Sequence, residues 1–182
     1  MKNRIFIITR LTSLIGRLLP ALFLNIVLGV LGYLSASFLI IFAARALLGY
    51  AGADPAVHVG VLVTAVFLCG LLRGVLRYFE QLAGHYMAFK LLAVLRDKVF
   101  SALRQLAPAK LEKKDRGEMI SVIMSDIELL EVFYAHTAGP VAIAVITSVV
   151  MTLYIGAQSA VLGAIAALAY LVVGVIIPWL NS

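Results

Sequence analysis

The side chains with the most distinctive chemistry form a short group in the first half of the chain. Arg73, Arg77 and Tyr78 are followed by His85, which falls on the same helical face as Tyr78. A neutral imidazole is a good axial ligand for haem iron, and arginines can line a path for an anionic solute. The plainer interpretations are a histidine at the headgroup level that pairs with Glu80 or with a neighbouring helix, and arginines that reach lipid phosphate.

The chain has none of the residue constellations of a soluble enzyme. It contains no HExxH metal motif, no GxSxG nucleophile motif and only one cysteine, Cys69. The phosphate-binding pattern GxxxxGK[ST] is also missing, and Gly29 and Gly32 lie inside an apolar run where they suit close helix packing. We therefore predict no catalytic residue and no metal site in this chain.

Composition places the chain in the membrane. Hydrophobic residues make up 63% of it, charged residues only 13%, and the mean hydropathy is +1.07. Soluble domains have about 45–50% apolar residues, so lipid must serve as the solvent for much of this surface. The excess of 15 basic over 9 acidic residues is then a sign of membrane topology and not of nucleic-acid binding.

The apolar pattern predicts four transmembrane helices, two of them with long extensions. A transmembrane helix needs about 20 apolar residues, and the sequence contains four apolar runs of about that length. The segment 57–106 contains no proline and reads as one helix, far longer than a bilayer requires. The predicted segments are an amphipathic surface helix at 1–17, spans at 18–44 and 57–106, a charged turn at 108–117, a helix at 118–156 that contains the third span, and a fourth span at 160–179.

Charge distribution predicts the orientation. Four Lys and Arg residues precede the first span, one (Arg45) follows it, and the other ten lie between residues 73 and 138. By the positive-inside rule, the N-terminus and the long middle region are cytoplasmic in a multi-pass protein of the plasma membrane. No charged residue lies in the middle of a span, which argues against a proton-coupled carrier and favours an external energy source.

The middle region carries a family resemblance. The residues Leu106-Ala107-Pro108, Arg116-Gly117-Glu118-Met119-Ile120-Ser121 and Ser125-Asp126-Ile127-Glu128 resemble the first intracellular loop of exporter-type ABC transporters, with a departure at Val122, where that family often has Arg. The upstream residues Arg77-Tyr78-Phe79-Glu80, His85, Phe89-Lys90 and Leu95-Arg96 resemble the CydC-type subunit of CydDC exporters.

This resemblance implies a six-span membrane domain followed by a nucleotide-binding domain, of which the chain would be a part truncated in the fourth span. ATP and Mg would bind to the missing domain, the intact protein would be an ATP-hydrolysing translocase, and a second transporter half would complete a homo- or heterodimer. The turn at 108–117 would be the coupling helix that contacts the nucleotide-binding domain, through Lys110, Glu112, Lys113, Lys114, Asp115, Arg116 and Gly117. The alternative is a solvated charged turn.

The CydC-type resemblance also implies a solute. It would be a small thiol such as cysteine or glutathione, or haem, which CydC-type proteins would engage at the position of His85. The sequence offers no second axial ligand, since His58 adjoins the turn between the first two spans and His136 lies near the third span. Haem would therefore need a partner subunit. The alternatives are an ABC exporter of a lipid, drug or peptide, and a stand-alone four-span interaction protein.

Overall fold

The computed structural model describes residues 19–52, 58–106 and 116–180. Within these ranges every residue is helical except the turn at Ala51 and Gly52 and the single residues His58 and Ser159. Four helical stretches are long and apolar enough to cross a membrane: Leu19–Tyr50, Val59–Gln105, His136–Gln158 and Ala160–Leu180. The predicted all-α membrane fold is thereby confirmed. The predicted surface helix at 1–17 and the first eight residues of the turn at 108–117 lie outside the described residues.

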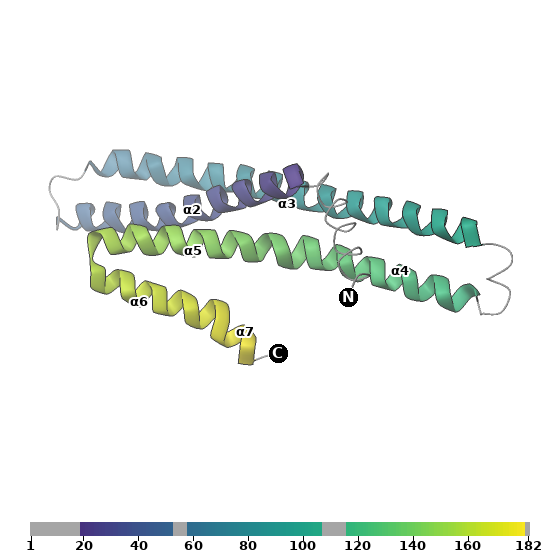
Figure 1. The fold of residues 1–182 in the computed structure, drawn as a ribbon. Coiled ribbons are helices and arrows are strands. Elements are labelled where there is room, and N and C mark those ends of the chain that lie inside the picture. The colour runs from purple at the N-terminus through teal and green to yellow at the C-terminus, as the bar shows by residue number, and fades with distance from the viewer. Residues whose placement is uncertain (1–18, 53–57, 107–115, 181–182) are drawn as a thin grey trace. The chain divides into compact units, whose positions relative to one another are not determined.

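The first two helices differ in how far they exceed a bilayer. Helix α2 covers Leu19–Tyr50, and α3 covers Val59–Leu106 (Figure 1). With 48 residues, α3 is about 72 Å long at 1.5 Å per residue, more than twice the hydrocarbon thickness of about 30 Å. Helix α2 continues past Arg45 and stops where Gly52 adopts a φ of +77°, a conformation that favours glycine at helix ends.

The second half of the chain is a pair of helices widened at two points. Helix α4 (Arg116–Phe133) leads through the π-helical segment η1 (Tyr134–Ala138) into α5 (Gly139–Gln158). After Ser159, α6 (Ala160–Leu171) leads through the π-helical segment η2 (Val172–Ile176) into α7 (Ile177–Leu180). Each π segment lies just before a proline, Pro140 or Pro178, whose ring would clash with the carbonyl group four residues earlier in a regular α-helix.

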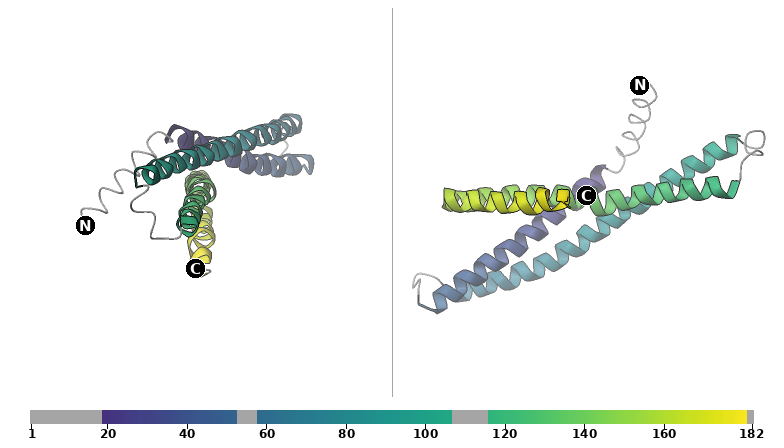
Figure 2. Two further views of the ribbon diagram at one scale, coloured as in Figure 1. Left: turned by 90° about the vertical axis from the view of Figure 1, so that its right-hand side faces the viewer. Right: turned by 90° about the horizontal axis from the view of Figure 1, so that it is seen from below.

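The chain divides into two compact units, and both α2 and α3 contribute residues to each. The first unit combines residues up to Asn25 with Gln81–Pro140. Its described part includes α4 and the second half of α3, and these two segments run side by side (Figures 1 and 2). An ion pair joins them, with Nη2 of Arg96 on α3 3.8 Å from Oε1 of Glu128 on α4. A small apolar core packs between α3 and the start of α2, made of Met87, Leu91, Leu95, Ala21 and Leu22.

The second unit combines Ile26–Glu80 with residues from Val141 onward, and glycines bring its helices together. A Cβ atom built on Gly32 of α2 would lie 3.6 Å from Leu76 Cβ of α3, an ordinary packing distance. Gly29 lies against Ile143 of α5, which is only 2% exposed. The small face predicted for α2 is thus confirmed as a helix-packing surface at Gly29 and Gly32.

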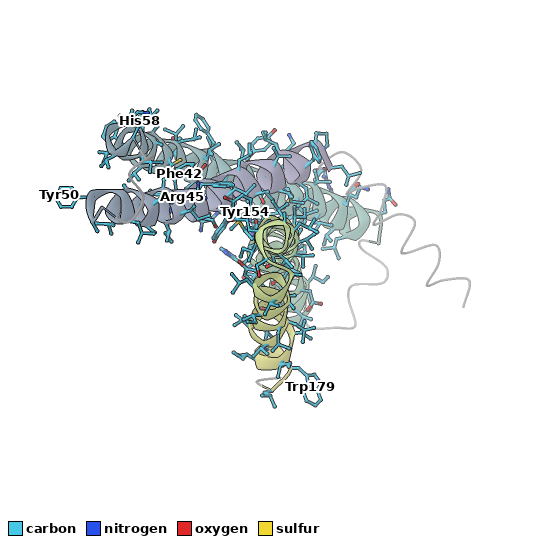
Figure 3. All side chains as sticks on the ribbon, turned by 90° about the vertical axis from the view of Figure 1, so that its left-hand side faces the viewer. Phe42, Arg45, Tyr50, His58, Tyr154 and Trp179 are labelled. Carbon is cyan, nitrogen blue, oxygen red and sulfur yellow. The ribbon has the colours of Figure 1, made fainter. Side chains whose placement is uncertain are left out.

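Aromatic side chains join α2 to α5 further along the same seam. The Phe38 ring lies 5.2 Å from the Tyr154 ring, edge to face, and 5.9 Å from the Phe42 ring. Figure 3 labels Phe42 and Arg45 on α2, Tyr154 on α5 and Trp179 at the tip of α7. Because Gly29 pairs with Ile143 and Phe38 with Tyr154, α2 and α5 run parallel to each other.

Candidate functional site

The two histidines of the first unit lie next to each other. His85 extends from α3 and His136 from η1, and their ring centroids are 6.1 Å apart with 73° between the ring planes. One helical turn after His85, the Phe89 ring stacks on the imidazole at 6.0 Å and 23°. Both histidines are exposed, so the pair is open to a ligand from outside the fold.

The sequence indicated no second axial ligand for His85 within the chain, whereas the structure places the imidazole of His136 beside it. The residues are 51 positions apart, and they meet because α4 folds back along α3. The cross-helix pairs His85–His136 and Arg96–Glu128 are both centred on residues 110–112, inside the predicted turn. A helical hairpin centred on that turn would have predicted this neighbour, whereas periodicity along one helix cannot.

Arg77 belongs to a second cluster, in the second unit. Its Nη1 atom donates to both carboxylate oxygens of Glu80, at 2.7 Å for Oε1, and its guanidinium carbon lies 5.9 Å from the centroid of the Tyr33 ring on α2. The Glu80 side chain is 8% exposed and that of Arg77 49%. Glu80, considered from sequence as a partner of His85, thus pairs with Arg77, and this cluster ties α3 to α2.

The remaining predicted residues of this region are exposed. The Tyr78 ring is 65% exposed and meets the edge of Phe79 at 5.3 Å. Arg73 is exposed on α3. Asn25 of α2 is buried, and a Cβ atom built on Gly84 would lie 3.0 Å from its Nδ2 atom. Such burial is typical of helix packing.

Most of the residues predicted to couple to the nucleotide-binding domain belong to the turn between α3 and α4. Lys110, Glu112, Lys113, Lys114 and Asp115 lie outside the described residues, and Arg116 and Gly117 are the first two residues of α4. Among the described ranges, no group of three His, Cys, Asp or Glu residues is arranged to hold a metal ion.

Comparison with known proteins identifies the family. The family model described as the ABC transporter transmembrane region matches residues 22–181. A probable ABC transporter ATP-binding/permease protein of Haemophilus influenzae is 44% identical over 181 residues, which is all of this chain and 33% of that protein. The glutathione/L-cysteine transport system protein CydC of Escherichia coli is 34% identical over 77 residues, covering 42% of this chain and 13% of its own length.

A CydD-type protein is also similar. The glutathione/L-cysteine transport system protein CydD of Bacillus subtilis is 29% identical over 135 residues, covering 73% of this chain and 23% of that protein. The chain therefore spans about a third of the length of the Haemophilus relative and less of the others. Together with four spans and long helical extensions, the family match over nearly all of the chain leads to one conclusion: the chain belongs to the ABC transporter transmembrane region family.

Proposed function

We propose that this chain is the membrane-spanning part of an ATP-driven exporter that moves a small thiol, such as cysteine or glutathione, out of the cytoplasm. One observation carries the proposal: the relatives named for a solute, CydC and CydD, both belong to glutathione/L-cysteine transport systems. The N-terminus is assigned to the cytoplasm by the positive-inside rule, with a nucleotide-binding domain and a second transporter half as partners.

The solute is tested with inside-out membrane vesicles that contain the full-length protein. We expect ATP-dependent uptake of radiolabelled glutathione or cysteine, and none with a non-hydrolysable ATP analogue. Uptake of a fluorescent lipid, a drug or a peptide with no thiol uptake would favour the corresponding alternative exporter. ATP hydrolysis without stimulation by either thiol would count against the proposal.

The length of α3 suggests how ATP hydrolysis reaches the membrane. A helix of about 72 Å extends some 40 Å beyond one bilayer crossing, and α4 runs back beside it. The turn between them, at 108–117, would contact the nucleotide-binding domain through its charged residues. Because two packed helices shift as a rigid pair, movement of the turn would reorient the spans between inward- and outward-facing states.

Removing charge from the turn should separate ATP hydrolysis from transport. In a variant with Glu112, Lys113 and Asp115 changed to Ala, we expect thiol uptake into the vesicles to fall at least fivefold. We also expect the solute no longer to increase the rate of ATP hydrolysis. The matched control changes Asp97 and Lys98, two exposed charged residues of α3 away from the turn, and should leave both activities unchanged. Full coupling in the turn variant would mean that these residues form a solvated turn only.

Haem is the second candidate ligand, and one observation favours it. His85 is exposed and accompanied by the imidazole of His136, so these two residues would hold an iron porphyrin through imidazole nitrogen. Bound haem would supply a redox-active iron. The role of His85 would be to donate an imidazole nitrogen, with Phe89 stacked on the ring to limit its rotation.

A haem difference spectrum tests that candidate. We expect the purified full-length protein to give a Soret band on addition of haemin, and His85→Ala to lose most of it. His58→Ala is the control, because His58 lies at the start of α3, far along the helix from His85. A Soret band of equal intensity in wild type and His85→Ala would exclude His85 as a ligand.

A further inference from the structure

The pair formed by His85 and His136 has the composition of a small metal site. Two of the three histidines in the chain meet across a helical hairpin, with ring centroids 6.1 Å apart. Neutral imidazole binds Zn²⁺, Cu²⁺ and Ni²⁺ well, whereas Mg²⁺ and Ca²⁺ prefer oxygen ligands. Although the sequence motifs predict no metal site, we propose that His85 and His136 bind one late first-row divalent metal ion, with water in the remaining coordination positions.

The geometry is compatible with a shared ion. Because Zn–N bonds are about 2.0–2.1 Å long, two rings that ligate the same ion have their centres about 5–6 Å apart. The observed separation of 6.1 Å lies just beyond this range. Both side chains are exposed, so a small turn of either ring about its χ angles would bring the pair within the range without displacing a core residue. The angle of 73° between the ring planes poses no obstacle, since a ring can rotate about its metal–nitrogen bond.

The π-helical segment gives the site its position. His136 lies inside η1, where the helix is widened just before Pro140, and widened turns of this kind are frequent at functional sites. On α3, the Phe89 ring stacks on the His85 imidazole with the two centroids 6.0 Å apart. An ion bound to both residues would join α3 to the point where α4 passes into α5.

The site differs from the haem candidate in its ligand, and the inference does not rest on the proposed function. A bare ion needs two nitrogen atoms and water, whereas a haem needs room for a porphyrin. The free ion is favoured because two exposed rings with centroids 6.1 Å apart need only turn about their χ angles to direct one nitrogen each at a shared ion.

Metal binding is measured on the full-length protein in nanodiscs after removal of metal by chelation. We expect isothermal titration with Zn²⁺ to show one site per chain, and Cu²⁺ to give an electron paramagnetic resonance spectrum with hyperfine coupling to imidazole nitrogen. His85→Ala and His136→Ala should each weaken Zn²⁺ binding at least tenfold and alter the Cu²⁺ spectrum. His58→Ala serves as the matched control and should bind as wild type does.

Three results would overturn the inference. They are unchanged Zn²⁺ affinity in both His85→Ala and His136→Ala, an equal loss in His58→Ala, and binding of haemin at His85 by a protein that binds neither Zn²⁺ nor Cu²⁺. His136→Gln, which keeps a polar side chain in η1, separates loss of the ligand from disturbance of the helix. Thiol transport is measured in parallel, so that failure of the metal site and failure of the proposed function are told apart.

Discussion

Gly29→Ala is expected to force α2 and α5 apart and to lower the melting temperature of the protein by several degrees. A Cβ atom at position 29 would lie 2.8 Å from Ile143 Cγ1 and 3.3 Å from Cγ2, and it would overlap Cδ1. Ile143 is 2% exposed and β-branched, so it has few other rotamers to adopt. Overpacking of a well-packed interior costs about 1–3 kcal/mol.

Gly32→Ala is the matched control on the same helix. The new methyl group would meet Leu76 Cβ at 3.6 Å, an ordinary contact, and alanine is the better helix former, so we expect unchanged or slightly higher stability. Ile143→Val, which removes Cδ1, should recover part of the loss in the Gly29→Ala background. Stability is measured by size-exclusion chromatography after heating in mild detergent. Equal melting temperatures for Gly29→Ala and Gly32→Ala would contradict the packing described for this seam.

Arg77→Gln is expected to have the second large effect, because it removes the guanidinium from a buried carboxylate. Breaking a fully buried ion pair by removing one partner costs about 3–5 kcal/mol. The Arg77 side chain is 49% exposed, so we expect a smaller loss of stability, of about 2 kcal/mol. The same change also removes the contact with the Tyr33 ring, which links α3 to α2.

A double-mutant cycle separates the two contacts of Arg77. Glu80→Gln removes the carboxylate charge that Arg77 compensates, so Arg77→Gln together with Glu80→Gln should be more stable than Arg77→Gln alone. Tyr33→Leu removes the aromatic face and should cost less than Arg77→Gln. If the double variant melts below both single variants, with losses that simply add, then the ion pair does not govern the stability of this region.

The membrane fold could be predicted because the solvent of each span is lipid, which demands long apolar helices whatever their packing. The ends of these helices were harder to predict. The span was predicted to end at residue 44, before Arg45, whereas the helix itself continues to Tyr50, because a single arginine can extend its side chain toward water. The π segments depend on Pro140 and Pro178, which the hydropathy pattern treats as ordinary residues of a span.

The candidate site was predictable where a residue's own type carries the chemistry. His85 and Arg77 were identified in that way, and the spacing of Arg77 and Glu80 along one helix would have sufficed to pair them. His136 and Tyr33 were missed as neighbours because each lies on another helix. Such contacts depend on which helices pack together and in what register, which one sequence does not reveal.

The turn between α5 and α6 limits where this half of the chain can flex. Only Ser159 lies outside the helices there, its hydroxyl accepts from Leu162 N at 3.5 Å, and the backbones of Gly156 and Gly163 touch with no side chain between them. Because this turn is so short and so closely packed, we expect α5 and α6 to move together as one rigid body. Bending would then fall to the two π-helical segments, 134–138 and 172–176, each of which is followed two residues later by a proline.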